Sequence, residues 1–137
     1  MDEKTLKKMI DEALDLMQHA YAPYSKYNVG STVLTARGNI YRGVNVENSS
    51  YGATICAERA AVLSAVTAEG PEMKLESVVV ATHSSPAAGP CGMCLQVLSE
   101  FGDSNLEIVM VNDKGEVIKS TLEKLLPFSF KQVFLKK

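Results

Sequence analysis

Apolar residues recur at helical spacing near the start of the chain and gather in shorter runs further along. Residues 2 to about 20 place apolar side chains three or four positions apart, which predicts an amphipathic helix. Its apolar face is formed by Leu6, Ile10, Leu14 and Met17, with Met9 and Ala13 beside them. Pro23 lies in the loop that follows and ends this helix.

Runs rich in β-branched residues predict a hairpin and then a buried sheet. Residues 29–35 and 40–46 form strands on either side of a glycine-containing turn. Within residues 77–82, every position between the terminal Ser and Thr is apolar, which is typical of a strand buried on both faces. Two further strands are predicted at residues 106–111 and 116–119.

Predicted helices alternate with these strands. Residues 56–68 are dense in alanine and precede Gly70, which predicts a helix with a glycine cap. Residues 90–101 predict a second helix and residues 121–125 a short third one. Strands that alternate with helices after an opening hairpin indicate an α/β layered domain with a mixed sheet. We expect residues 1–137 to form a single domain.

Composition narrows the classes of function. The formal net charge of −2 argues against a general nucleic-acid-binding protein, because such proteins normally carry a basic face. No apolar run is long enough to cross a bilayer, and the N-terminus lacks the apolar core of a signal peptide. None of the 3 cysteines needs to form a disulfide, which fits a reducing cytoplasm.

All 3 cysteines lie in two short motifs, C-A-E-R at residues 56–59 and P-C-G-M-C at residues 90–94. Three thiolates form a borderline-soft ligand set that suits Zn²⁺. Structural zinc sites usually have four protein ligands, whereas catalytic sites usually have three and leave a position for water. The set therefore favours a catalytic metal. Taken alone, the pair Cys91 and Cys94 is equally compatible with a redox motif.

One carboxylate lies at a suitable offset to handle protons beside such a metal. Glu58 follows Cys56 by two residues, and a Pro-Cys-x-x-Cys segment comes later, which is the pattern of zinc deaminases. In that pattern the glutamate transfers protons and does not bind zinc. Both cysteine motifs are predicted at helix N-termini, where the helix dipole stabilises thiolates. A solvated helix turn is the alternative for Glu58 and Arg59.

The chain resembles the cytidine deaminases, a family of small homotetrameric enzymes that act on nucleosides. Beyond the cysteine motifs, the resemblance rests on A-P-Y-S-K-Y-x-V-G at residues 22–30, N-V-E-N at residues 45–48, and L-L-P at residues 125–127 with Phe130. The cysteine motifs alone are shared by a broad deaminase superfamily, and the N-V-E-N segment narrows the match. The resemblance implies a three-layer α-β-α sandwich with a mixed five-stranded sheet.

The resemblance also implies roles for individual residues. Cys56, Cys91 and Cys94 are expected to bind one zinc ion per chain. Glu58 is expected to transfer protons, and Arg59 to lie near a metal-bound thiolate. Substrate binding is assigned to Asn45, Glu47, Tyr27, Ala57 and Phe130.

The four side chains among these substrate-binding residues each have a physical rationale and an alternative, which for Phe130 is packing into the core of its own chain. Asn45 and Glu47 are two apart near a predicted strand end, so they point to one side and suit the hydroxyls of a sugar. The Glu47 carboxylate would repel a phosphate and favour nucleosides over nucleotides. Two exposed strand residues are the alternative. Tyr27, where the family usually has Phe, should line the base pocket or else pack against the strand. Phe130 is expected to reach a neighbouring subunit's base pocket, so that a homotetramer shares its active sites.

The implied activity is hydrolytic deamination of cytidine and deoxycytidine to uridine and deoxyuridine with release of ammonia, in cytoplasmic pyrimidine salvage. The substrate is therefore a small nucleoside, with no nucleic-acid or membrane partner. Leu95 departs from the family, which commonly has Arg there, as do Asn28 and Ser31 from a frequent Pro and Ala. Leu95 keeps open a deaminase of a modified cytosine nucleoside, such as a nucleoside antibiotic. A structural-zinc interaction protein is the other alternative.

Overall fold

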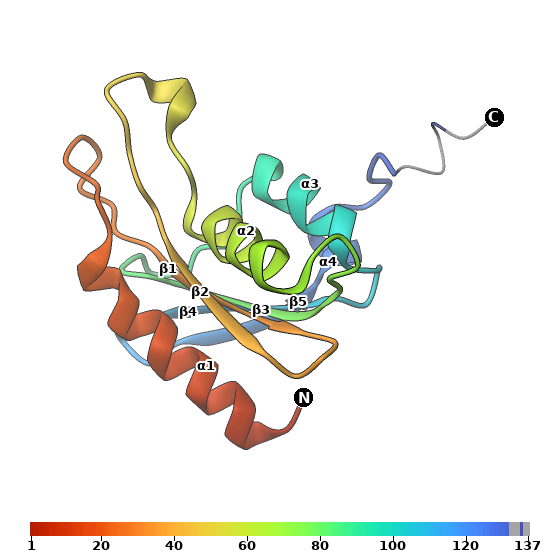
Figure 1. Ribbon diagram of the computed structural model, residues 1–137. Coiled ribbons are helices and arrows are strands. Elements are labelled where there is room, and N and C mark those ends of the chain that lie inside the picture. The colour runs from red at the N-terminus through yellow and green to blue at the C-terminus, as the bar shows by residue number, and fades with distance from the viewer. Residues whose placement is uncertain (132–134, 136–137) are drawn as a thin grey trace.

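A five-stranded sheet lies at the centre of the computed structural model, which describes residues 1–131 and 135 (Figure 1). Its strands are β1 (Gly30–Thr35), β2 (Ile40–Val44), β3 (Leu75–Thr82), β4 (Glu107–Asn112) and β5 (Val117–Thr121). They lie in the order β2-β1-β3-β4-β5, with β3 and β4 parallel and the other neighbours antiparallel. The predicted mixed sheet is confirmed.

Helices cover both faces of this sheet (Figure 1). They are α1 (Glu3–Leu16), α2 (Ala57–Glu69), α3 (Gly92–Phe101) and α4 (Leu122–Leu125), with short 3-10 turns η1 (Met17–His19) and η2 (Tyr51–Ala53). Successive side chains of a strand point to opposite faces. Val79 and Ala81 of β3 accordingly pack with α1, whereas Val78 and Val80 pack with α2 and α3. The predicted three-layer arrangement is confirmed.

Two predicted elements shift when the layers pack. The buried face of α1 centres on Met9, Ala13 and, just beyond its end, Met17, while the predicted Leu6, Ile10 and Leu14 are only partly buried beside them. Strand β3 begins at Leu75 instead of residue 77, because Leu75 still pairs with Thr35 of β1. Both differences arise from neighbours in the sheet that local periodicity does not specify.

A close approach between α2 and β2 positions the start of α2. A Cβ atom added to Gly43 would lie 2.4 Å from both the carbonyl oxygen of Ala57 and the backbone nitrogen of Ala61. Only glycine therefore fits under the first turns of this helix. At its other end, Gly70 adopts φ +84°, a left-handed conformation that favours glycine, and the predicted glycine cap is confirmed.

Among the described residues, none of the helices has both the length and the apolar character needed to cross a membrane.

Candidate metal centre and substrate pocket

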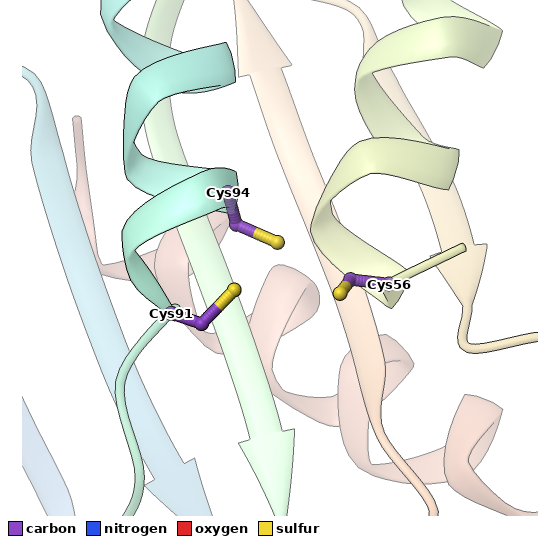
Figure 2. Close-up of side chains that lie close together, drawn as sticks. All are labelled: Cys56, Cys91 and Cys94. Carbon is purple, nitrogen blue, oxygen red and sulfur yellow. The ribbon is translucent and has the colours of Figure 1, made fainter. Parts of the chain in front are cut away.

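The three cysteine thiols converge from two helix N-termini. Cys56 is the N-cap residue of α2, Cys91 is the N-cap residue of α3, and Cys94 lies in the first turn of α3. Their sulfur atoms point into one space and all lie within 4.8 Å of one another (Figure 2). Thiolates on a tetrahedral zinc ion lie roughly 3.8 Å apart, given Zn–S bonds of about 2.3 Å. The group is therefore close to the geometry that one zinc ion requires.

The donor set fits a catalytic zinc ion. Within the described part of the chain, no His, Asp or Glu joins the three cysteines as a further ligand. His83 instead has its Nδ1 atom 2.6 Å from Asp113 Oδ2, and His19 is exposed at the end of η1. Three thiols from two rigid helix ends leave a coordination position for water, as catalytic zinc sites do. We conclude that the group can bind one Zn²⁺.

Electrostatics at the cysteine group favour a thiolate. A hydrogen bond from the Cys94 thiol, together with the guanidinium of Arg59, lowers the pKa of Cys56 to about 5. Donating that hydrogen bond and being buried raise the pKa of Cys94. Arg59 is held beside the sulfur, with Nη2 at 3.8 Å from Cys56 Sγ and 2.9 Å from the carbonyl oxygen of Thr54. Arg59 is therefore placed beside a ligand, as predicted, and does not form a solvated turn.

Glu58 is buried in the first turn of α2, next to the thiols. It is only 5% exposed, and burial raises the pKa of its carboxyl group to about 7. The charge of Cys56 raises this pKa further, while a hydrogen bond from its own backbone N–H and the charge of Arg59 oppose the rise. A carboxyl group with this pKa can both accept and donate a proton near neutral pH. The preceding residue, Ala57, is fully buried.

Backbone pairing brings the N-V-E-N segment alongside the first cysteine. Strand β2 ends at Val44, earlier than the predicted end at residue 46. Val46 instead forms two hydrogen bonds of 2.9 Å with Ile55, the residue before Cys56. Asn45 and Glu47 therefore lie on either side of Val46, whose backbone pairs with the residue just before Cys56.

Asn45 is not an exposed strand residue. It is 8% exposed, and its side chain holds a neighbouring loop through two hydrogen bonds. Its Oδ1 atom accepts from the backbone N–H of Val29 at 2.9 Å, and its Nδ2 atom donates to the carbonyl oxygen of Tyr27 at 2.7 Å. The alternative of two exposed residues is therefore wrong for Asn45.

Glu47 binds the same loop at an earlier point. Its Oε1 atom accepts from the backbone N–H groups of Tyr24 at 3.0 Å and Ser25 at 3.1 Å, and its Oε2 atom accepts from the hydroxyl of Ser25. The hydrogen bonds from Ser25 lower the pKa of Glu47, so its carboxylate stays ionised. Glu47 and Asn45 therefore both bind the loop at residues 22–29.

Tyr27 projects from this loop and does not pack in the core. Its side chain is 41% exposed, and its hydroxyl shares a hydrogen bond of 2.9 Å with Ser84 Oγ. Ser84 Oγ is in turn 2.8 Å from Thr82 Oγ1 at the end of β3. Tyr27 is therefore partly exposed, with its hydroxyl beside the end of β3.

Phe130 lies away from the cysteines along the chain's C-terminal segment. It is 56% exposed, and its carbonyl oxygen accepts a hydrogen bond of 2.9 Å from Gln96 Nε2. With Leu122 and Leu126 it lines a cavity of about 540 Å³ whose lining contains none of the cysteines. Within one chain, the structure therefore does not bring Phe130 to the predicted metal centre. Leu95 is 6% exposed and belongs to the core.

Sequence reasoning missed three residues that support these side chains, namely Ser25, Thr54 and Ser84. Ser25 and Ser84 each offer a hydroxyl, and Thr54 offers its carbonyl oxygen to Arg59. A serine or threonine in a loop carries no periodic signal. The position of Ser25 inside the segment 22–30 was the only hint of its importance.

Comparisons with known proteins agree with this geometry. A family model described as the cytidine and deoxycytidylate deaminase zinc-binding region matches residues 3–110. A probable cytidine deaminase of Dictyostelium discoideum is 45% identical over 96% of this chain and 88% of its own length. A cytidine deaminase of Sporosarcina psychrophila is 41% identical over 91% of this chain and 90% of its own length. The crystal structure of cytidine deaminase from Burkholderia pseudomallei matches with a TM-score of 0.86 at 37% identity, and the match covers 95% of this chain and 100% of that one.

A protein that acts on an antibiotic is more distant. The blasticidin-S deaminase of Bacillus cereus is 28% identical over 77% of this chain and 79% of its own length. The comparisons therefore favour ordinary nucleosides over a nucleoside antibiotic.

Proposed function

The chain belongs to the cytidine and deoxycytidylate deaminase family, and we propose that it hydrolyses cytidine and deoxycytidine to uridine and deoxyuridine with release of ammonia. The observation that carries this proposal is the convergence of Cys56, Cys91 and Cys94 beside the buried carboxyl group of Glu58. A protein that used zinc only for structure would not need a proton carrier there. The proposal treats residues 1–137 as one deaminase domain.

Glu58 is the proton carrier of the proposed reaction. The three cysteines hold one Zn²⁺, which when bound acidifies a water molecule and supplies Lewis-acid chemistry. Glu58 accepts a proton from the attacking water and donates it to N3 of the cytosine ring. It then takes the proton of the new hydroxyl group on C4 and transfers it to the amino group, which leaves as ammonia while the C4 carbonyl forms. Its pKa of about 7 suits both directions of transfer at neutral pH.

Arg59 adjusts the charge of the ligand set. Three thiolates and one Zn²⁺ carry a formal charge of −1, which would make a bound water less acidic. The guanidinium group at 3.8 Å from Cys56 Sγ offsets part of this charge.

Substrate recognition divides between sugar and base. Asn45 and Glu47 bind the sugar hydroxyls, and the ionised Glu47 disfavours a phosphate, so nucleosides are preferred to nucleotides. Tyr27 and Ala57 line the base pocket. Replacing Glu47 by Ala should weaken the binding of cytidine far more than the binding of free cytosine, because only the nucleoside has hydroxyls for this carboxylate. If the binding of both substrates weakened equally, the assignment of Glu47 to the sugar would be contradicted.

Phe130 completes the site of a neighbouring subunit in a homotetramer. The exposure of Phe128 and Phe130, at 105% and 56%, gives the C-terminal segment an apolar surface suited to a subunit contact. Phe130→Ala should raise KM and leave zinc content unchanged. Mixing this variant with Glu58→Gln should change the activity through mixed sites, provided that subunits exchange. A fully active monomer by light scattering would contradict shared sites.

The proposed setting is pyrimidine salvage in the cytoplasm, where a reducing environment keeps the three zinc-binding thiols free of disulfides.

An ammonia-release assay tests the proposed activity directly. Zinc-loaded protein should release ammonia from cytidine and deoxycytidine, and Glu58→Gln should serve as the inactive control. Free cytosine, the nucleotide and modified nucleosides form the other arms. The proposal is wrong if zinc-loaded protein acts on neither nucleoside, and a preference for a modified nucleoside would restore the alternative substrate.

A further inference from the structure

The hydroxyl of Ser25 lies between two residues assigned to different parts of the substrate. It donates to Glu47 Oε2, and its oxygen accepts a hydrogen bond of 3.0 Å from the backbone N–H of Tyr27. A serine hydroxyl has one proton and two lone pairs. Its single proton is therefore committed to Glu47 while a lone pair holds the backbone of Tyr27.

The turn that carries Tyr27 depends on these contacts. Lys26, between Ser25 and Tyr27, has φ +60°, a left-handed conformation that costs free energy for a residue other than glycine. Such a conformation persists only where the surroundings enforce it. Ser25 anchors this turn on one side of Lys26. On the other side, the carbonyl oxygen of Tyr27 is held by Asn45.

We propose that Ser25 is a positioning residue that couples the carboxylate of Glu47 to the ring of Tyr27, so that the sugar and base subsites adjust together. The inference rests on the proposed function, because Glu47 and Tyr27 bind substrate only under that proposal. The loop fills three of the roughly four acceptor positions of the Glu47 carboxylate. A sugar hydroxyl that binds Glu47 either takes the remaining position beside Ser25 or displaces Ser25, and displacement frees the hydroxyl that holds the backbone of Tyr27.

Three serine variants test this role in the zinc-loaded protein. Ser25→Ala removes both hydrogen bonds of the hydroxyl, Ser25→Thr keeps a hydroxyl at an exposed position, and Ser64→Ala makes the same replacement at an exposed position of α2. A hydrogen bond to a charged group corresponds to about a 10- to 100-fold effect. Ser25→Ala should therefore raise KM for cytidine about tenfold or more, with kcat nearly unchanged. Ser25→Thr should restore KM, and Ser64→Ala should behave as the parent protein.

A second replacement tests whether Ser25 and Glu47 act together on KM. In a Glu47→Ala background, Ser25→Ala should raise KM by a smaller factor than it does in the parent protein, because the contact between Ser25 and Glu47 is already gone. If the KM increases of the two single variants simply multiplied in the double variant, the proposal would be overturned. Ser25→Ala that lowers kcat as strongly as kcat/KM would also overturn it.

Amide hydrogen exchange at Tyr27 gives a readout that does not require turnover. Ser25→Ala should lose protection there, and Ser25→Thr should keep it. Unchanged protection in Ser25→Ala would overturn the inference even in an active enzyme. If the parent protein acts on neither nucleoside, the proposed function fails, and the exchange result still decides whether Ser25 holds Tyr27.

Discussion

Glu58 and Glu69 lie at opposite ends of α2, and the fold shifts their pKa values in opposite directions. Glu58 is buried, whereas Glu69 is half-buried as a residue although little of its side chain is exposed, and burial raises the pKa of both carboxyl groups. The pKa of Glu58 is raised to about 7, whereas the pKa of Glu69 is lowered. Burial alone cannot explain two opposite outcomes on one helix.

Hydrogen-bond donors explain the difference. The Oε2 atom of Glu69 accepts from Asn39 at 2.9 Å, Thr35 at 2.8 Å and Tyr41 at 3.0 Å, and these bonds favour its ionised form. For Glu58, the described residues supply no side-chain donor, and the neighbouring Cys56 adds negative charge. Glu69 is therefore a fixed anion that ties the end of α2 to the β1–β2 hairpin.

The hydrogen-bond partners of a buried carboxyl group therefore decide whether it stays ionised. A carboxylate with several donors is held in one protonation state and serves the fold. One that is desolvated without such donors has a pKa near the working pH and can carry protons. The predictions below test this division.

The largest expected effect is a difference in kcat between variants of the two glutamates. Glu58→Gln should lower kcat by ~10²–10⁴-fold or more, because the amide cannot transfer protons, while zinc content stays unchanged. Glu69→Gln should retain kcat close to that of the parent protein. Ammonia release and metal analysis on both variants measure this. A loss of less than about tenfold in Glu58→Gln would mean that the proton carrier is assigned wrongly.

A replacement under the start of α2 should disturb the Glu58 end alone. Gly43→Ala places a methyl group 2.4 Å from the backbone of the helix, and such overpacking costs about 1–3 kcal/mol of unfolding free energy or more. Denaturant unfolding measures the loss, and activity should fall with it as the helix start moves. Gly52→Ala is the matched control, because its Cβ meets no atom within 4 Å. Equal stability of the two variants would show that the close approach does not constrain α2.

The contribution of Glu69 to stability should depend on pH. Since the folded pKa of Glu69 lies below its ordinary value of 4.5, its ionised form stabilises the fold above that pH. This contribution is lost as the pH falls through the folded pKa. The Tm of Glu69→Gln should therefore lie furthest below that of the parent protein near neutral pH, and the gap should narrow in acid. A gap that is constant with pH would contradict an anionic role.

The smallest effect is expected from a single donor. Tyr41→Phe removes one of the three hydrogen bonds to Glu69 Oε2 and leaves those from Thr35 and Asn39 in place. Its Tm should fall less than that of Glu69→Gln. In a Glu69→Gln background the same change should have a reduced effect, because the charged acceptor is already gone. Purely additive losses would show that Tyr41 stabilises the fold by packing and not through Glu69.

Sequence alone was sufficient for the elements and for the group of cysteines that could hold a metal ion. Helical and strand periodicity placed the helices and strands to within about two residues at most ends, because these signals are local. The cysteine motifs pointed to the three thiols that the structure brings together and to the buried Glu58 beside them, since residue type and spacing at a helix N-terminus limit the chemistry available. The segment around Asn45 and Glu47 was also recognised.

Tertiary structure alone decided how these parts meet. The thiols of Cys56 and Cys94 come within 4.8 Å because α2 and α3 pack side by side on one face of the sheet. The contacts of Ser25 with Glu47 and of Tyr27 with Ser84 join residues 22 and 57 positions apart. Hydroxyl groups in loops have no periodicity, and the pKa of a buried carboxyl group depends on donors from other elements. Packing therefore determines both, which is why one helix has a carboxyl group with a raised pKa at its start and one with a lowered pKa at its end.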